Sequence, residues 1–298
     1  MRIASLVPSS TEMLFALGLG GQVVAVTHEC DFPPEAAALP HLSETMIPPG
    51  LSPAEIDAEV KQLVRQGDPL YRLKADVLES VRPDLIIAQD VCAVCAVSYD
   101  DVLTMAARLP GNPTVLRQDP TSLAEVLDNA IEVAEAAGRP DVGLALKAEL
   151  ESRITAVREA VTGRRRPTVL ALEWLDPPFT GGHWVPEMIE IAGGIDLVGK
   201  PGLKSAEHAW EDLVGLNPDL TVVMPCGYGA DQAAGQAREY VNRIKSTGAE
   251  RIVAVDAAAS FSRPGPRLID GIELLGSVLH PDAASATDRD RLDHFAVY

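Results

Sequence analysis

The chain has 298 residues, of which 47% are apolar and 23% charged, enough to bury one or two hydrophobic cores. Its formal net charge of −18 opposes the attraction to phosphate groups on which binding to nucleic acids or anionic membranes depends. The chain contains no run of 18 apolar residues, so membrane insertion is not expected. We expect a globular protein without a nucleic-acid partner.

The first elements alternate between strand and helix. Residues 2–7 read as a strand, and Ser9 and Glu12 follow with the spacing of a helix capping box. The apolar helix predicted for residues 11–18 ends at glycine, and residues 23–26 form a second predicted strand. This order is typical of parallel α/β sheets.

Two segments, residues 78–89 and 213–224, repeat the same plan. Each has the end of an amphipathic helix, then Pro-Asp, then a short apolar run rich in β-branched residues, with a cysteine within three residues of its end. Such runs form strands that are buried on both faces. Because α/β sheets bind ligands at the carboxyl ends of their strands, two copies predict a cleft with contributions from two walls.

The segment between the two copies is predicted to be helical. Residues 122–161 contain no strand signal, and residues 141–162 predict one uninterrupted helix, which would span about 33 Å. Beyond it, residues 168–172 predict a strand, residues 173–183 a loop rich in proline and glycine, and residues 184–191 a helix that ends at two glycines.

Together these elements predict an α/β protein with two Rossmann-like lobes, in which parallel sheets are joined by a single long helix and a ligand cleft lies between the lobes. The expected divisions are an N-terminal α/β lobe, a connecting helical segment, a C-terminal α/β lobe and a loose tail, at residues 1–120, 121–165, 166–281 and 282–298.

The four cysteines follow predicted strands and are all expected to face the cleft. One interpretation is a metal site made by Cys92, Cys95, His28 and Cys30, because thiolates and imidazoles are common metal ligands. The other interpretation is that Cys30, Cys92, Cys95 and Cys226 line an apolar pocket or pack beneath it. One Cys-x-x-Cys pair does not decide between them.

Aromatic side chains gather in the same predicted loops. Trp174, Trp184, Tyr228, Tyr71 and Phe261 are expected to surround one opening. Flat side chains favour a large, flat, partly apolar ligand because they supply contact area with little loss of rotamer entropy. The alternative places Trp184 and Trp210 in the core as helix anchors, and for Trp210 the core is the favoured interpretation.

Several segments resemble a known family. Residues 5–12, 83–87, the long helix, residues 209–213 with 218–222, and residues 262–267 resemble the helical-backbone, or class III, periplasmic binding proteins. These are the substrate-binding components of ABC importers for cobalamin, haem and ferric siderophores. The resemblance spans residues 1–281. It is greatest to the cobalamin-binding, BtuF-like branch, and within it to proteins that lack an export signal and carry motifs like residues 28–33 and 92–98.

The resemblance implies a monomeric binding protein, not an enzyme, whose ligand is a cobalamin-like corrinoid or a related tetrapyrrole or metal chelate held in the cleft between the lobes. Arg263 is expected to pair with peripheral carboxylate or phosphate groups, and His28 or His183 to reach the metal of the ligand axially. The expected ligand-binding residues are Ser9, Ser10, His28, Glu29, Cys30, Tyr71, Gln89, Cys92, Cys95, Glu173, Trp174, His183, Trp184, Cys226, Tyr228, Phe261 and Arg263.

The resemblance also implies an ABC permease as partner, although the chain as written enters a predicted strand without a signal sequence. A cytoplasmic location is expected from this, or a periplasmic or extracellular one if a signal was removed. Residues 52–80 are longer than expected for exported cobalamin binders and are expected to form a lid or an altered pocket wall.

The alternative function is a cytosolic metal-binding protein or a thiol- or metal-dependent enzyme. Glu173, His183, His28 and the thiol of Cys92 or Cys95 offer an acid, a base and a nucleophile. No nucleophile elbow, zinc-protease motif or phosphate-binding loop accompanies them, so no reaction class is implied and no catalytic residue is assigned.

Overall fold

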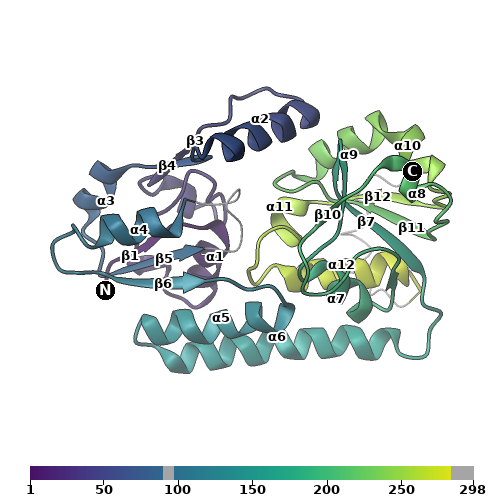
Figure 1. Ribbon diagram of the computed structural model, residues 1–298. Coiled ribbons are helices and arrows are strands. Elements are labelled where there is room, and N and C mark those ends of the chain that lie inside the picture. The colour runs from purple at the N-terminus through teal and green to yellow at the C-terminus, as the bar shows by residue number, and fades with distance from the viewer. Residues whose placement is uncertain (90–96, 283–298) are drawn as a thin grey trace. The chain divides into compact units, whose positions relative to one another are not determined.

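The computed structural model describes residues 1–89 and 97–282 (Figure 1). Its contacts divide the chain into two compact units. The N-terminal lobe comprises residues 1–120 and 124–149, and the C-terminal lobe comprises residues 121–123 and the described residues from 150 onward. The division falls within α6 (Pro140–Val161), a helix of 22 residues at the place where the sequence predicts one long helix.

The N-terminal lobe is built on a four-stranded sheet in which every neighbouring pair is parallel, in the order β2-β1-β5-β6. The strands are β1 (Ile3–Ser5), β2 (Val23–Ala25), β5 (Leu85–Gln89) and β6 (Thr114–Gln118). Successive side chains of β5 enter two different cores, Leu85 and Ile87 on one face and Ile86 and Ala88 on the other. The repeated apolar run therefore forms a strand buried on both faces, as predicted.

Helices cover both faces of this sheet. Buried residues of α1 and α5, with partly buried residues at the beginning of α6, pack on the face of Leu85 and Ile87, and buried residues of α3 and α4 pack on the face of Ile86. The elements are α1 (Pro8–Ala16), η1 (Gly20–Gln22), η2 (Ala36–Ala38), α3 (Ala75–Val81), α4 (Tyr99–Ala106) and α5 (Leu123–Ala136).

The beginning of α1 differs from the prediction. The helix starts at Pro8 with Val7 as its N-cap and no side-chain cap, so the expected capping box of Ser9 and Glu12 is wrong. Proline is favourable at the first helical position because its φ is already helical and it has no N–H to satisfy. Ser9 and Glu12 consequently lie inside the helix and are buried.

Residues 52–80 contain a helix, a strand and most of α3. The helix α2 (Pro53–Gln66) is capped by Ser52, which exchanges hydrogen bonds with Glu55. Beyond it, β4 (Tyr71–Leu73) pairs antiparallel with β3 (Ser43–Thr45), and Tyr71 stands opposite Thr45. This antiparallel pair brings Ser43 and Tyr71 to the end of β2, where the candidate site lies.

The C-terminal lobe contains a mixed sheet in the order β10-β8-β7-β11-β12, with β9 also paired to β7. Its strands are β7 (Thr168–Leu175), β8 (Pro178–Thr180), β9 (Ile195–Asp196), β10 (Ala206–Glu207), β11 (Leu220–Val223) and β12 (Ile252–Ala254). The pairs β7–β11, β11–β12 and β7–β9 are parallel, whereas β7–β8 and β8–β10 are antiparallel.

Two expectations for this lobe are therefore corrected. The sheet is not wholly parallel, and residues 173–183 are not a single loop. The strand β7 continues to Leu175 and turns back at Asp176 and Pro177 into β8, where Trp174 pairs with Phe179. Of the residues that suggested a loop, Pro177 lies in this turn, Pro178 is the first residue of β8, where proline is tolerated, and Gly181 and Gly182 follow the strand.

The remaining helices complete the C-terminal lobe. Buried residues of α8, α9 and α10 pack with Leu170, Leu172 and Val223 of the sheet, and α7 packs against α12. The helices are α7 (Val185–Ile191), α8 (Trp210–Leu213), α9 (Ala230–Glu239), α10 (Val241–Ser246), α11 (Ala257–Ser260) and α12 (Leu268–Leu279). None of the helices in the described ranges is long and apolar enough to cross a membrane.

The repeated Pro-Asp has the same structural task in both lobes. Asp84 accepts a hydrogen bond of 2.7 Å from the backbone N–H of Arg2, immediately before β1. Asp219 accepts one of 2.7 Å from the backbone N–H of Thr168, the first residue of β7. In each lobe the aspartate ties the start of the strand that it precedes to the start of a neighbouring parallel strand.

Candidate functional site

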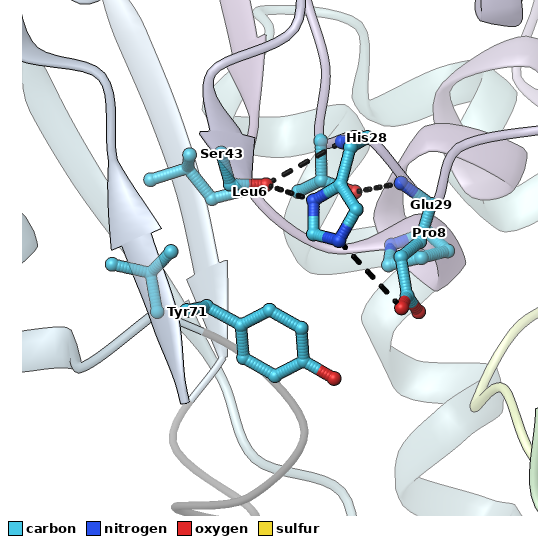
Figure 2. Close-up of a pocket in the computed structure, with 8 residues that line it drawn as sticks. Leu6, Pro8, His28, Glu29, Ser43 and Tyr71 are labelled. Atoms are coloured by element: carbon cyan, nitrogen blue, oxygen red, sulfur yellow. Dashed lines mark hydrogen bonds and ion pairs between the residues drawn. The ribbon is translucent and has the colours of Figure 1, made fainter. Parts of the chain in front are cut away.

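His28 is the central residue of the candidate site in the N-terminal lobe. It follows β2 by three residues, at the carboxyl end of the parallel sheet, where α/β folds bind ligands. Its Nδ1 lies 2.8 Å from the hydroxyl of Ser43, and the two rings of His28 and Tyr71 are 5.7 Å apart. Figure 2 shows the imidazole between Ser43 and Glu29, with the phenol of Tyr71 beside it.

The second ring nitrogen of His28 is buried and forms no hydrogen bond with any described residue. Glu29 Oε1 lies 3.8 Å from this Nε2, beyond hydrogen-bonding distance. Burial lowers the pKa of His28, against the opposing effect of the Glu29 carboxylate, so the imidazole is neutral at pH 7. A neutral imidazole with one nitrogen held by a hydroxyl is suited to use the other as a metal ligand or hydrogen-bonding group.

A small hollow surrounds this imidazole. It borders the first residue of α1, and the side chain of Glu29 at its edge is 49% exposed. Tyr71 is half-buried, so its ring forms part of the wall without being sealed in the core. The lining residues are Leu6, Pro8, Thr27, His28, Glu29, Ser43, Tyr71 and Val97 (Figure 2).

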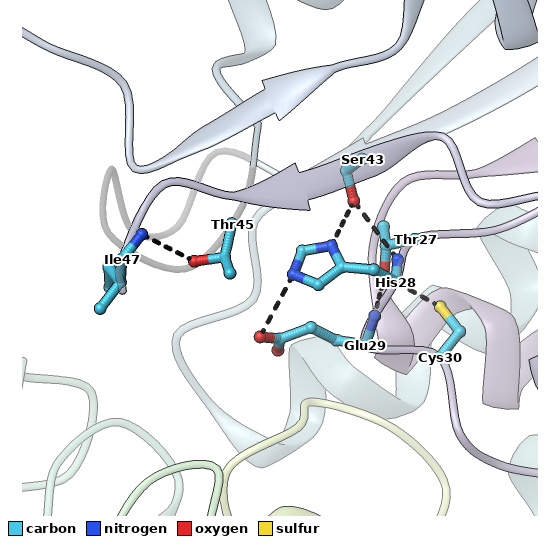
Figure 3. Close-up of polar contacts among 7 residues, drawn as sticks. All are labelled: Thr27, His28, Glu29, Cys30, Ser43, Thr45 and Ile47. Carbon is cyan, nitrogen blue, oxygen red and sulfur yellow. Dashed lines mark hydrogen bonds and ion pairs between the residues drawn. The ribbon is translucent and has the colours of Figure 1, made fainter. Parts of the chain in front are cut away.

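Cys30 lies behind the hollow, not on its surface. Cys30 is 2% exposed, and its thiol contacts the hydroxyl oxygen of Thr11 at 3.1 Å. It also contacts the hydroxyl oxygen of Thr27 at 3.2 Å (Figure 3). The expectation that every cysteine faces a cleft is therefore wrong for Cys30, because the threonine hydroxyls hold its thiol in the core. This position agrees with the alternative interpretation, in which cysteine packs beneath the pocket.

The other expected residues of this lobe differ in accessibility. Ser9, Ser10 and Gln89 are buried, the two serines in the first turn of α1 and Gln89 at the last position of β5. Cys92 and Cys95 lie outside the described residues. Among the residues that are described, no group of three histidine, cysteine or acidic side chains is arranged to hold a metal ion.

In the C-terminal lobe, Trp174 and Tyr228 form an aromatic pair. Their rings meet edge to face at 5.6 Å, and both side chains are half-buried. The indole N–H of Trp174 donates to the carbonyl of Asp176 at 3.2 Å, which fixes the ring over the β7–β8 turn. Tyr228 follows β11, where Cys226 is exposed and donates its backbone N–H to the Glu173 carbonyl at 3.0 Å.

Glu173 points away from solvent. Its carboxylate accepts hydrogen bonds from the backbone N–H of Gly182 at 3.1 Å and from the hydroxyl of Ser205. Burial raises the pKa of Glu173 to about 7, even though these two hydrogen bonds oppose the shift, and Asp196 raises it further. Glu173 is thus bonded within the lobe and is not aimed outward at the surface.

Trp184 and Phe261 are both buried. The indole of Trp184 donates to the carbonyl of Phe261 at 2.8 Å, which joins the beginning of α7 to the loop after α11. His183 stands just before Trp184 with a φ of +51°, is half-buried, and has its pKa lowered by burial. Arg263 is half-buried in the loop that begins at Phe261. Trp210 is buried, as its favoured interpretation predicts.

Three polar residues of these sites were not predicted from the sequence: Ser43, Ser205 and Asp196. Ser43 and Ser205 carry no motif, and each reaches its partner only because an antiparallel strand pair forms, β3 with β4 and β8 with β10. Asp196 is half-buried at the end of β9, and its buried Oδ2 has no hydrogen-bond partner among the described residues.

Comparison with known families decides the class of the protein. A family model described as periplasmic binding protein matches residues 3–260. The chain belongs to the periplasmic binding protein family. The resemblance and the fold class expected from the sequence are thereby confirmed at the level of the family.

Curated relatives and solved structures agree with this assignment. An ABC transporter substrate-binding lipoprotein of Bacillus subtilis strain 168, YvrC, described as uncharacterized, is 25% identical over 94% of this chain and 80% of its own. The vitamin B12-binding protein of Vibrio cholerae is 21% identical over 91% of this chain and 86% of its own.

Among solved structures, the periplasmic heme-binding protein RhuT of Roseiflexus sp. RS-1 superposes with a TM-score of 0.66 at 25% identity, covering 95% of this chain and 99% of RhuT. The vitamin B12-binding protein BtuF of Vibrio cholerae superposes with a TM-score of 0.64 at 19% identity, covering 95% and 98%.

These relatives bear on two further expectations. Each is named as a binding protein, which agrees with the prediction of a binding protein and not an enzyme. The expected cytoplasmic location finds no support, because the matched family is periplasmic and the Bacillus relative is a lipoprotein.

Proposed function

We propose that this protein binds a metal-containing tetrapyrrole of the corrinoid class as the substrate-binding component of an ABC importer. The observation that carries the proposal is His28, a neutral imidazole beside the ring of Tyr71 whose Nε2 makes no hydrogen bond with any described residue. A cobalt centre with an exchangeable axial site is the kind of group that such a nitrogen binds. Axial binding requires the exposed side chain of Glu29 to turn away from Nε2.

The aromatic pair of the C-terminal lobe supports a flat ligand. Trp174 and Tyr228 offer two half-buried rings fixed at the end of β7 and after β11. Aromatic contacts of this kind contribute roughly 0.5–1.5 kcal/mol beyond their buried area. The proposal thus assigns ligand contacts to both lobes, with Arg263 pairing with peripheral acidic groups and Cys92 and Cys95 as further predicted contacts.

Relatives in the family are named for vitamin B12 and for haem. Haem is therefore the competing ligand, and Tyr71 beside His28 provides a phenolic oxygen that suits iron. As its partner we propose an ABC permease, and as its location the periplasm or the outer face of the membrane, in keeping with the lipoprotein relative.

The test is titration of the purified protein with hydroxocobalamin, cyanocobalamin and haem, followed by absorption spectra and tryptophan fluorescence. Hydroxocobalamin carries an exchangeable axial water, so binding through His28 shifts its absorption band. The variant His28→Ala is expected to lose this shift and to bind at least about tenfold more weakly. The matched control His41→Ala removes a histidine of the same lobe that does not line the hollow, and keeps the shift.

Further outcomes separate the alternatives. Trp174→Ala is expected to weaken binding by up to about tenfold through loss of ring contacts. Cys92→Ser tests the thiol contact, and metal analysis of the same sample tests a resident ion. Stoichiometric zinc without any response to the three tetrapyrroles would favour the metal-site alternative, and no response to any of them without zinc would refute both.

A further inference from the structure

Glu173 joins three separate segments of the C-terminal lobe. It belongs to β7, one of its oxygens accepts the N–H of Gly182 at 3.1 Å, and the other accepts the hydroxyl of Ser205. Gly182 precedes His183 in the turn between β8 and α7. Ser205 belongs to residues 200–208, which we call the strap.

The strap follows the edge of the β7–β8 hairpin. His183 donates its backbone N–H to Leu203 at 2.6 Å, and Gly202 donates back to the carbonyl of His183 at 2.9 Å. Beyond Ser205, β10 pairs antiparallel with β8, and His208 Nε2 lies 3.0 Å from the hydroxyl of Thr180. The strap is thus tied to the turn at His183 and to the hairpin that carries Trp174.

The packing between the strap and the turn leaves no room for a side chain. A Cβ placed on Gly182 would lie 2.2 Å from the backbone nitrogen of Ser205 and 2.8 Å from the carbonyl oxygen of Leu203. The backbone of the strap therefore lies in direct contact with Gly182, and a residue with a side chain at position 182 would push the strap away. The Glu173 carboxyl is the side chain that bonds to both of these touching segments.

We propose that Glu173 is a positioning residue, which holds the strap against the turn of Gly182 and so sets the placement of His183 and the Trp174 hairpin for ligand binding. The proposal rests on the proposed function for the ligand, and assigns to Glu173 a role within the protein in place of the ligand contact expected from the sequence. Ser205 is its partner in this role.

The contact between the strap and the turn of Gly182 depends on pH because the Glu173 carboxyl is buried. Burial raises the pKa of Glu173 to about 7 from an ordinary value of 4.5, and Asp196 of β9 acts in the same direction. The strand β8 has no titratable side chain, and the strap carries Lys200, Lys204, Glu207 and His208. Lys204 lowers the pKa of the neighbouring His183.

Whether the strap opens more at low or at high pH depends on which form, open or closed, binds the proton of Glu173 more tightly. A strap that lifts off exposes Glu173 to water, where its pKa returns toward 4.5, so the closed form binds the proton more tightly than the open form. Protonation therefore favours the closed strap. Between pH 6 and pH 8 the equilibrium constant for opening is expected to rise about tenfold, from pKa values of about 7 and 4.5.

The test is amide hydrogen exchange of residues 181–184 and 200–208 at pH 6 and pH 8, after division by the intrinsic exchange rates. Wild type is expected to open about tenfold more at pH 8. Glu173→Gln keeps the shape of the side chain without its charge and is expected to change by less than about twofold. Ser205→Ala raises exchange of the strap at both pH values. The control Glu207→Gln removes an exposed carboxylate of the strap and retains the wild-type response.

A second readout connects the strap to ligand binding. With hydroxocobalamin or haem, Glu173→Ala is expected to bind at least about fivefold more weakly than wild type, and Glu173→Gln within about twofold. A wild type without pH-dependent opening, a Glu173→Gln variant that keeps the tenfold response, or a folded Glu173→Ala variant with wild-type affinity would overturn the positioning role. If wild type binds neither tetrapyrrole, the proposed function fails, and the exchange data alone still decide whether Glu173 holds the strap.

Discussion

Replacing Asp219 by alanine is expected to weaken the C-terminal lobe where β7 begins. Its Oδ2 accepts hydrogen bonds from the backbone N–H of Thr168 at 2.7 Å and from the Thr168 hydroxyl at 3.0 Å. Its Oδ1 accepts from Arg165 at 2.6 Å, and the Arg165 side chain is 75% exposed. The substitution removes both acceptor oxygens and with them all three hydrogen bonds, and it leaves the N–H of Thr168 without this partner.

The expected loss of stability in Asp219→Ala is the sum of the separate contributions of these hydrogen bonds. An unpaired, partly buried backbone N–H costs about 1–3 kcal/mol, whereas the ion pair with the exposed Arg165 side chain adds little because solvent screens it. We expect Asp219→Ala to lower the free energy of unfolding by about 2–3 kcal/mol, which corresponds to a fall in Tm of about 4–10 °C. Asp84→Ala is expected to cost only about 1 kcal/mol, because the N–H of Arg2 that it accepts from is exposed and can bond to water.

The assay is urea unfolding followed by circular dichroism, with hydrogen exchange at residue 168 to locate the effect. Asp231→Ala, in which an exposed carboxylate of the same lobe is removed, is the control and is expected to change stability by less than about 0.5 kcal/mol. Arg165 and Thr168 hold the pKa of Asp219 below its ordinary value. Its contribution is therefore present above pH 4 and is lost as pH falls through the lowered pKa. A variant at Asp219 as stable as wild type at pH 7 would refute the reasoning.

Three further outcomes are expected. Because the pKa of Glu173 is raised to about 7, its contribution to stability is full below pH 4.5 and is lost as pH rises toward 7. Between pH 5 and pH 8 the free energy of unfolding of wild type should therefore fall by about 2–3 kcal/mol relative to that of Glu173→Gln, as measured by urea unfolding. Cys30→Ser should leave tetrapyrrole affinity within about twofold of wild type, since the thiol is buried behind the hollow; a large loss in a titration would place it at the ligand. Arg153 donates from two nitrogens to the two carboxylate oxygens of Glu273, at 2.8 and 2.7 Å. Lysine cannot form this paired contact, so Arg153→Lys should lower the free energy of unfolding by about 1–2 kcal/mol and lower Tm. An unchanged melting curve would contradict this.

The N-terminal sheet could be predicted in some detail because its strands are buried on both faces. A strand such as β5, with Leu85 to Ala88 alternating between two cores, must be continuously apolar, and that pattern is visible without a structure. The long helix α6 was predictable for a similar reason, since its period and its flanking glycine and proline are local features.

The edge of the C-terminal sheet could not be predicted in the same way. Residues 173–183 contain prolines and glycines that are typical of a loop, yet β7 extends to Leu175 because β8 pairs with it and β10 pairs with β8. Antiparallel pairing at an edge satisfies the backbone through a partner distant in the chain, and residues 206–207 carry no strand pattern of their own. The position of Ser205 beside Glu173 depends on that pairing.

The candidate site shows the same division. The sequence identified His28, Tyr71, Trp174 and Tyr228 as residues with suitable chemistry, and the structure brings them together in two pairs, one in each lobe. It places Cys30 and Trp184 in the core, although their residue types suggested ligand contacts. Residue type and distance from a strand end do not show whether a side chain points into the core or toward the pocket.

The sequence by itself determined the α/β architecture, the repeated Pro-Asp strand and the family, because each can be recognised from local patterns of apolar, turn-forming and helix-ending residues. Only the tertiary structure decided that the repeated aspartates bond to neighbouring strands, that Ser43 bonds to His28, and that Ser205 bonds to Glu173. Each of these is a hydrogen bond between segments far apart in the chain. Such bonds form only after folding has brought the two segments together.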